Sequence, residues 1–566
     1  MTIDNDYIAD QFSLLAKIMD IHGENIFKTR SYSNAAFTIE KLPEQLTAIP
    51  PEKVTSIKGI GDAIGKKIHD IITTGELRLL NEYIAKTPPG IIEMLKIKGL
   101  GPKKIATVWK EMEVESLGEL LYACQENRLL LYKGFGEKTQ KNVMEAIEFY
   151  FSNQGSHLFS EVEAYARGIH QTLQRHFRNA QFSFTGAFRR QLEIIDQLEW
   201  VTTADPKVLA DLFAAAGFTA LDPADTVSAS APSLSSFKGP EGIPLHFTHT
   251  NPDNFFSTLL ATSCSGEFLD LWQQTTNWAP SSTSYPSEEA IFTQHNINFI
   301  PPYLREQRAV LQHAATAPLP TYIRAEDIRA IIHSHSKWSD GSNTLEEMAR
   351  ACIAKGYEYL VISDHSKSAF YANGLNEDRI ALQHREIDQL NKELAPFVIF
   401  KSIECDILND GALDYSDNIL STFDCIIASV HANLKMSEDK AMTRLLRAIE
   451  NPYTTILGHM TGRLLLSRPG YPVDHKKIID ACVANKVVIE LNAHPRRLDM
   501  DWRWIGYALE RGALISVDPD AHSTEGYNDV KYGVLAAQKG GLIPDRNLSS
   551  FTLEQFNDFL NARRNS

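Results

Sequence analysis

A length of 566 residues is too great for one hydrophobic core, so about three or four domains are expected. The composition, 43% hydrophobic and 22% charged, is that of an ordinary globular protein. No run approaches the ~18 apolar residues of a membrane span and the N-terminus lacks a signal-peptide pattern, which argues against membrane insertion and secretion and favours the cytoplasm. A net charge of −15 argues against nonspecific electrostatic binding of nucleic acid over a large part of the protein surface. Six cysteines without a CxxC pair indicate reduced, mostly buried thiols.

The charge is unevenly distributed along the chain. Residues 1–155 contain 19 Lys and Arg against 21 Asp and Glu, whereas the remainder contains 37 against 50. Contacts with nucleic acid are therefore expected to be local and to come from the N-terminal part.

Three copies of one short pattern, an apolar residue, Lys, Gly, an apolar residue and Gly, occur in the N-terminal part. They lie at residues 57–61, 97–101 and 132–136, and each precedes a helical stretch with further lysines. Two glycines at this spacing permit a tight turn that exposes backbone N–H groups at the start of a helix, where a phosphate binds without its base being recognised. The pattern resembles helix-hairpin-helix motifs, with Gly59, Gly61, Gly99, Gly101, Gly134 and Gly136 as DNA-binding residues. The alternative is that each pattern only turns one helix into the next.

Between residues 325 and 520, seven short apolar runs predict β-strands. They span 328–333, 359–363, 398–403, 425–430, 455–458, 487–491 and 514–517. Polar side chains stand at or just after their C-terminal ends: His333, His335, Asp364, His365, Glu404, His431, His459, Asn492, His494, Asp520 and His522. Parallel strands of a barrel open their C-terminal ends onto one face, so these side chains would converge. Converging imidazoles and carboxylates predict a multinuclear metal site and a metal-dependent hydrolase.

Other segments carry motifs of a known family. Residues 27–36 read FKTRSYSNAA, residues 185–190 read TGAFRR, and residues 299–306 read FIPPYLRE. Together with the three repeats, and with the chain from His333 onward, they resemble the bacterial family X DNA polymerases that carry a C-terminal PHP (polymerase and histidinol phosphatase) domain.

The resemblance implies a multidomain α plus α/β protein. Residues 1–80 would form a helical helix-hairpin-helix domain, and 81–155 a fingers-like helix-hairpin-helix domain. Residues 156–320 would form a degenerate polymerase-like α+β palm and thumb, and 325–566 a PHP domain with a distorted (β/α)7 barrel.

The PHP resemblance assigns nine metal ligands. They are His333, His335, Asp340, His365, Glu404, His431, His459, Asp520 and His522. Such a mixed set suits three divalent ions, Mn²⁺ or Zn²⁺, with Fe²⁺ compatible. Arg463, shortly after His459, is assigned to a catalytic role as a clamp for a substrate phosphate.

The polymerase resemblance fails at the residues that carry the chemistry. The three catalytic acids of the family align with Gln197, Glu199 and His246, and its nucleotide-binding Ser aligns with Ala187. Two-metal phosphoryl transfer requires oxygen anions at these positions. Polymerase activity is therefore expected to be absent. The alternative is that another acid, such as Asp196 with Glu199, serves instead.

Lys28 and Tyr32 match the 5′-phosphate pocket of some family members, and Lys67 aligns with the Schiff-base lysine with which those members remove a 5′-deoxyribose phosphate. All three residues are expected to contact DNA. For Lys67 a solvated lysine on a DNA-facing helix is the favoured explanation, and lyase activity is not predicted.

The combined expectation is a DNA-binding, metal-dependent phosphoesterase, a 3′-to-5′ exonuclease that processes DNA ends in repair. Its partner would be DNA at ends, gaps or nicks, bound without regard to sequence, with no membrane and with the protein as a monomer. The alternatives are an active repair polymerase with PHP proofreading, a non-enzymatic DNA-end scaffold and a small-molecule phosphatase.

Overall fold

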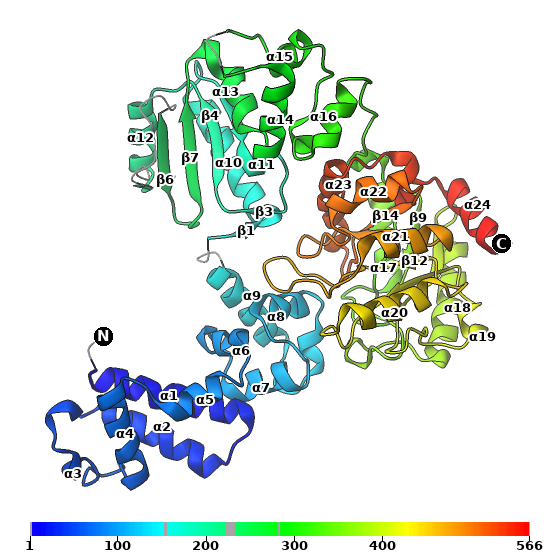
Figure 1. The fold of residues 1–566 in the computed structure, drawn as a ribbon. Coiled ribbons are helices and arrows are strands. Elements are labelled where there is room, and N and C mark those ends of the chain that lie inside the picture. The colour runs from blue at the N-terminus through cyan, green and yellow to red at the C-terminus, as the bar shows by residue number, and fades with distance from the viewer. Residues whose placement is uncertain (1–2, 43, 152–154, 222–232, 281–282, 565–566) are drawn as a thin grey trace. The chain divides into compact units, whose positions relative to one another are not determined.

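The structure is a computed structural model that describes residues 3–42, 44–151, 155–221, 233–280 and 283–564. The chain divides into two compact units, Met1–Tyr150 and Phe151–Ser566 (Figure 1). The four-domain boundaries expected from the sequence stay a prediction. All six cysteines are buried and unbonded, as expected. Among the described residues, no helix combines the length and the apolar character needed to cross a membrane.

The first unit is entirely helical. Its α-helices are α1 (Asn5–His22), α2 (Ile26–Glu40), α3 (Pro51–Val54), α4 (Asp62–Thr74), α5 (Arg78–Ile84), α6 (Pro89–Glu93), α7 (Pro102–Lys110), α8 (Leu117–Gln125) and α9 (Glu137–Phe151). Asp4 caps the N-terminus of α1 by accepting a hydrogen bond from the Tyr7 N–H, and Gly23 ends the helix in a left-handed conformation. The buried face of α1 and α2 forms the core against which α4 and α5 pack.

The second unit begins with a mixed α/β region. Its elements are β1 (His157–Leu158), α10 (Phe159–His176), β2 (Phe182–Thr185), α11 (Gly186–Arg189), β3 (Ile194–Ile195), β4 (Leu198–Thr202), α12 (Pro206–Ala215), β5 (Thr219–Ala220), β6 (Leu234–Lys238), β7 (Pro244–His249), α13 (Phe255–Thr262), α14 (Gly266–Thr276), α15 (Glu288–Gln294) and α16 (Arg308–Ala314). Five of the strands form a sheet in the order β2-β4-β7-β6-β5. We call residues 156–320 the polymerase-like region.

A barrel of alternating strands and helices completes this unit. Its elements are β8 (Ala330–Ile331), α17 (Leu345–Lys355), β9 (Tyr359–Ile362), α18 (Glu377–Glu393), β10 (Val398–Asp406), α19 (Asp417–Leu420), β11 (Cys425–Ser429), α20 (Glu438–Ile449), β12 (Ile456–Leu457), α21 (His475–Ala484), β13 (Val488–Asn492), α22 (Ile505–Glu510), β14 (Ile515–Asp518), α23 (Val530–Lys539) and α24 (Leu553–Arg564). All seven strands are parallel to their neighbours and follow chain order. A parallel bridge between Ser334 and Ala521 joins the two edges, which nearly closes the barrel.

The seven predicted strands are all present, with shifted ends. The first and fifth are reduced to two residues, and β10 continues to Asp406, so Glu404 lies within its strand. A capping box begins the first barrel helix: Thr344 and Glu347 cap the N-terminus of α17, and Gly356 ends the helix with positive φ.

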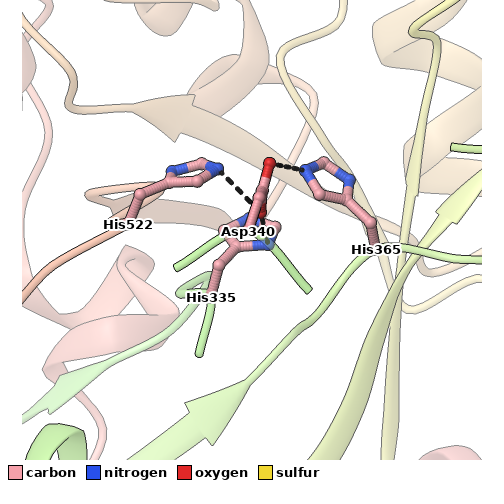
Figure 2. Close-up of side chains that lie close together, drawn as sticks. All are labelled: His335, Asp340, His365 and His522. Carbon is pink, nitrogen blue, oxygen red and sulfur yellow. Dashed lines mark ion pairs between the residues drawn. The ribbon is translucent and has the colours of Figure 1, made fainter. Parts of the chain in front are cut away.

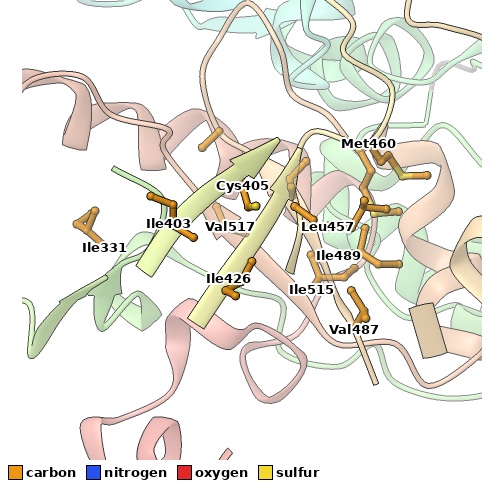
Figure 3. Close-up of a cluster of buried hydrophobic side chains, with 14 of the residues drawn as sticks. Ile331, Ile403, Cys405, Ile426, Leu457, Met460, Val487, Ile489, Ile515 and Val517 are labelled. Atoms are coloured by element: carbon orange, nitrogen blue, oxygen red, sulfur yellow. The ribbon is translucent and has the colours of Figure 1, made fainter. Parts of the chain in front are cut away.

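Alternate residues along the strands pack into two different cores. Ile403, Ile426 and Leu457 face the surrounding helices (Figure 3). Tyr359, Cys425 and the residues at corresponding positions of the neighbouring strands pack near the N-terminal ends of the strands, against α24. There Phe556 stacks on Tyr359, with ring centroids 4.7 Å apart. The apolar interior is therefore filled at one end of the barrel, and the opposite end is left for polar side chains.

Candidate metal centre and DNA-binding hairpins

The nine predicted metal ligands converge at the C-terminal ends of the barrel strands. His333 and His335 follow β8, His365 follows β9, His431 follows β11, His459 follows β12, Asp520 and His522 follow β14, Glu404 lies on β10, and Asp340 comes from the turn after His335. The first and last strands thus contribute two ligands each across the edge where the barrel closes. His333 and Asp520 both adopt positive φ, of 59° and 52°, which is uncommon for residues other than glycine and typical of functional sites.

Eight of the nine ligands form three overlapping groups. In each group the ligand atoms lie within 4.8 Å of one another; the groups are His335, Asp340, His365 and His522, then His333, His335, Glu404 and Asp520, and then His365, Glu404 and His431. Figure 2 shows the first group, in which Asp340 lies between His365 and His522 at 3.5 Å from a ring nitrogen of each. The ninth ligand, His459, places Nε2 2.9 Å from Oε1 of Glu404. His335, His365 and Glu404 are each shared between two groups, as bridging or neighbouring ligands of a multinuclear centre would be.

The chemistry of this cluster fits bound divalent ions. Nε2 of His333, Nδ1 of His335 and Nδ1 of His459 are buried and make no hydrogen bond to any described residue. Leaving a buried polar atom without a hydrogen bond costs about 1–3 kcal/mol, so several together indicate a missing partner. Imidazole nitrogens alternating with carboxylate oxygens are the donors that transition metals and zinc prefer. The cluster therefore binds divalent metal.

Electrostatics keep part of the cluster in the form that binds metal. Burial, reinforced by neighbouring His522 and His365, lowers the pKa of His335 to about 3, so this imidazole is neutral. Burial alone would also lower the pKa of His431, but the carboxylates of Glu404 and Asp406 outweigh burial and raise this pKa to about 10. Metal binding at His431 must therefore displace a proton.

Two buried carboxylates that were not predicted orient the ligands. Glu490, on β13, contacts Nδ1 of His333 through one oxygen and accepts the His459 N–H through the other at 2.5 Å. Asp406, on β10, lies 2.9 Å from Nδ1 of His431. Such partners fix the ring orientation and the tautomer of a metal-binding histidine. The signal for Glu490 was present in the sequence, as a lone acid inside an apolar strand.

Asp364 and Asn492, which also stand at strand ends, support the ligands instead of joining them. Asp364 accepts hydrogen bonds from the backbone N–H and hydroxyl groups of Ser336 and Ser339, and so it holds the turn that carries Asp340. Asn492 donates to Oδ2 of Asp520 at 3.0 Å. The remaining strand-end residue, His494, is partly buried and belongs to none of the three groups.

Arg463 lies beside the site with its guanidinium engaged by the protein. Nη1 donates to Asp501 at 2.5 Å, Nε donates to the Arg497 carbonyl at 2.9 Å, and Nη2 donates to the Leu498 carbonyl at 2.5 Å. Its role as a phosphate clamp stays a prediction, and it would require the Arg463 guanidinium to give up some of these protein contacts in order to bind a phosphate. Arg497, by contrast, places Nε 3.8 Å from Oδ2 of Asp520 and is a nearer cation that was not predicted.

The three predicted hairpins have the same geometry. The first glycine of each has positive φ: 98° at Gly59, 94° at Gly99 and 97° at Gly134. The apolar residue between the glycines is buried and donates its N–H to the apolar residue three positions earlier, as Ile60 does to Ile57 at 2.9 Å. The lysine before each first glycine is exposed. The second glycines, Gly61, Gly101 and Gly136, directly precede α4, α7 and α9 and have open space where a Cβ would project. Each hairpin thus presents an uncovered helix start beside a lysine, which suits a DNA phosphate.

The residues of the predicted 5′-phosphate pocket also lie together. The Tyr32 ring is buried and has Nζ of Lys67 at 5.9 Å from its centroid. Burial raises the pKa of Tyr32, and the nearby Lys28 opposes this effect. The structure brings all three side chains together; their contact with DNA stays a prediction.

The degenerate polymerase positions are adjacent on the sheet of the polymerase-like region. Glu199 on β4 is paired with His246 on β7, and Gln197 directly precedes β4. The Glu199 carboxylate lies so close to Gly186 that a Cβ there would be 1.7 Å from Oε2. Burial raises the pKa of Glu199, and His246, whose pKa is lowered by burial, makes a 2.7 Å hydrogen bond with Ser236. Asp196, the alternative acid, lies between β3 and β4 and accepts a hydrogen bond from Ser156.

The arginines that follow are paired within the protein. Arg189 donates to both carboxylate oxygens of Glu288, which also pairs with the fully buried Arg305. Arg190 donates from Nε to Glu306 at 2.8 Å. These guanidinium groups are therefore occupied by carboxylates of the same region.

A parallel seven-stranded barrel with this ligand set, together with three hairpins, defines a DNA-binding protein with a PHP-type, metal-dependent phosphoesterase domain. A helix-hairpin-helix domain family matches residues 3–77, and a SAM-like helix-hairpin-helix tandem family matches residues 91–148. The chain is 31% identical over 562 residues to the DNA polymerase/3′-5′ exonuclease PolX of Bacillus subtilis, covering 96% of this chain and 97% of that protein. It therefore belongs to the PolX family, the bacterial family X DNA polymerases with a C-terminal PHP domain.

Smaller relatives match the C-terminal part. A protein of Caldanaerobacter subterraneus subsp. tengcongensis named as a probable phosphatase is 28% identical over 207 residues, covering 34% of this chain and 74% of the relative. Probable phosphatase YcdX of Escherichia coli is 27% identical over 207 residues, covering 34% and 78%. The matched part of this chain thus corresponds to 74% and 78% of these two relatives.

Proposed function

We propose that the protein is a 3′-to-5′ exonuclease that trims DNA ends in repair in the cytoplasm, and that its polymerase-like region does not synthesise DNA. The observation that carries the hydrolytic role is the set of buried imidazole nitrogens without hydrogen bonds, gathered with Glu404 and Asp520 at the barrel mouth. The relative from Bacillus subtilis is named as a 3′-5′ exonuclease, which supports the polarity. The three hairpins supply the grip on DNA ends, gaps or nicks.

The residues of the chain would divide the work of hydrolysis. The nine ligands would hold three divalent ions, Mn²⁺ or Zn²⁺, with Fe²⁺ compatible. When bound, such ions lower the pKa of water to about 7 and offset the negative charge of a phosphodiester. Glu490 and Asp406 would keep His333 and His431 oriented, and Asp364 would hold the turn that carries Asp340.

The absence of synthesis is proposed from the charges of the polymerase-like region. Transfer of a nucleotide requires anionic oxygens to hold two metal ions, and of Gln197, Glu199 and His246 only one is an acid. That acid lies against the Gly186 backbone, and Arg189 is paired with Glu288. The alternative, an active polymerase with PHP proofreading, is supported by the Bacillus subtilis relative, which is named as a DNA polymerase as well as an exonuclease.

One assay distinguishes these readings. Labelled primer-template is incubated with Mn²⁺, with and without deoxynucleotides, using the wild-type protein and His333→Ala. We expect the wild type to shorten the primer from its 3′ end and His333→Ala to leave it unchanged under both conditions. Extension of the primer by His333→Ala would show an active polymerase. DNA binding without shortening by the wild type would favour a scaffold.

A further inference from the structure

The loop that joins β13 to α22 contacts the predicted ligand Asp520 and also Thr461, which lies close in sequence to the predicted ligand His459. Arg497 on this loop lies 3.8 Å from the ligand Asp520. Asp499 accepts hydrogen bonds from the Thr461 N–H at 3.0 Å and from its hydroxyl at 2.9 Å, and Thr461 stands two residues after the ligand His459. A shift of this loop would therefore move the surroundings of both ligands.

The same loop is held from within the barrel domain by Arg463. The guanidinium of Arg463 binds the Asp501 carboxylate and the carbonyls of Arg497 and Leu498. Asp501 in turn accepts from Arg503 at 2.9 Å. The loop is thus part of a connected network of ion pairs that runs from the chain after His459 to Arg503.

Two carboxylates of the polymerase-like region hold the outer ends of this loop. Glu161, on α10, accepts a 2.7 Å hydrogen bond from Nη2 of Arg496, whose side chain is only 6% exposed. Glu193, just before β3, accepts from the indole N–H of Trp502 at 3.1 Å and from Arg503 at 3.0 Å. One carboxylate therefore acts on the residue next to Arg497, and the other on the network that includes Asp501.

We propose that Glu161 and Glu193 are positioning residues for the PHP metal centre, so that the polymerase-like region braces the loop beside Asp520 and His459. This inference rests on the proposed hydrolytic function. Removing the Glu161 carboxylate would take its ion pair away from the buried Arg496, which favours movement of the loop. Displacing a group that supports a metal ligand typically lowers metal affinity about tenfold to a hundredfold. The region would then contribute to hydrolysis without any nucleotide chemistry of its own.

A third ion pair between the same two parts of the unit provides a matched control. Glu163, two residues beyond Glu161 on α10, pairs with Lys531 at 2.5 Å and has a side chain only 6% exposed. Lys531 lies on α23, outside the β13–α22 loop. Glu163→Gln therefore removes an ion pair between the polymerase-like region and the barrel domain without touching the proposed brace.

The test uses the full chain. Mn²⁺ alone is first titrated into the protein by calorimetry to measure the metal affinity, and the rate of DNA hydrolysis is then measured as a function of Mn²⁺ concentration. Arg496→Gln and Glu193→Gln should each weaken Mn²⁺ binding about tenfold, and Glu163→Gln should leave it within about twofold. Arg496→Lys, which keeps the charge, should recover most of the affinity. Arg496→Gln is preferred to a change at Glu161 because the second oxygen of Glu161 also accepts the Leu158 N–H.

Either of two results would contradict the proposed brace. One is Mn²⁺ affinity that is unchanged in both Arg496→Gln and Glu193→Gln. The other is a loss of Mn²⁺ affinity in Glu163→Gln as large as the loss in those two variants. Failure of the proposed function looks different, because the wild type would then bind Mn²⁺ in the calorimeter but would not hydrolyse DNA.

Discussion

The barrel mouth and the polymerase-like region both gather charged side chains at the edge of a sheet, but they satisfy those charges differently. At the barrel mouth, ring nitrogens of His333, His335 and His459 remain buried without hydrogen bonds. In the polymerase-like region, the guanidinium groups of Arg189 and Arg190 are neutralised by glutamates of the same region. Several buried ring nitrogens that make no hydrogen bond to a described residue indicate a ligand-binding site, whereas guanidinium groups paired with nearby glutamates indicate a structural role.

The largest effect on hydrolysis should come from removing a predicted metal ligand at the barrel mouth. Asp520→Ala should reduce Mn²⁺-dependent hydrolysis at least about a thousandfold, equivalent to about 4 kcal/mol of transition-state stabilisation. The same truncation in the second region, Glu199→Ala, should leave hydrolysis within about twofold. The check is the rate of release of the 3′-terminal nucleotide by both variants. Comparable losses in the two variants would remove the distinction between the regions.

A smaller effect should follow from changing a carboxylate that only orients a ligand. Glu490→Gln removes the charge that faces His333, so Mn²⁺ affinity should fall about tenfold to a hundredfold, measured by calorimetry. Asp414→Asn is the control, because Asp414 is also a buried carboxylate of the barrel but accepts from Ser368. If Asp414→Asn lowered the affinity as much, the loss would reflect general damage to the barrel.

The hairpins should affect binding without affecting the metal centre. Gly59→Val combined with Gly99→Val forces two positive-φ positions to accept a branched side chain, so DNA affinity should fall about tenfold for unrelated sequences alike, and added salt should weaken binding further. Fluorescence anisotropy with two duplexes measures this. Gly75→Val is the control, since Gly75 has a φ of 78° but ends α4 away from the hairpin turn. Loss of binding to only one duplex would contradict backbone recognition.

The smallest effect concerns the stability of the polymerase-like region. Because burial raises the folded-state pKa of Glu199 above its unfolded value, the stability present below about pH 4.5 is lost as the pH rises through the folded pKa. Glu199→Gln cannot ionise, so it should melt at the same temperature as the wild type at pH 4 and at an equal or slightly higher temperature at pH 7. A large drop at pH 7 would show that the Glu199 charge is needed.

Eight of the nine predicted ligands could be located from the sequence because they lie at or near strand ends that short apolar runs reveal, whereas Asp340 lies in a turn, and it was the PHP resemblance that selected the nine from the other strand-end residues. The supporting residues were not. Glu490 acts on His333 across 157 positions, and Arg496 acts on Glu161 across 335. Arg463 was assigned to a phosphate, but its engagement by Asp501 depends on a loop whose path no periodicity encodes. The ends of strands can be predicted from the local sequence pattern, whereas the partner of a buried charged side chain can be identified only from the three-dimensional fold.

Predicted metal ligands follow both the first and the last strand of the barrel. During synthesis, the chain should therefore become able to bind DNA before it can hydrolyse it. During synthesis the N-terminal part emerges and folds first. The three hairpins are therefore complete while Asp520 and His522 have yet to be made. A nascent chain, or one cut short before Asp520, would hold DNA without the means to degrade it. Nuclease competence would appear only after Asp520 and His522 have been made.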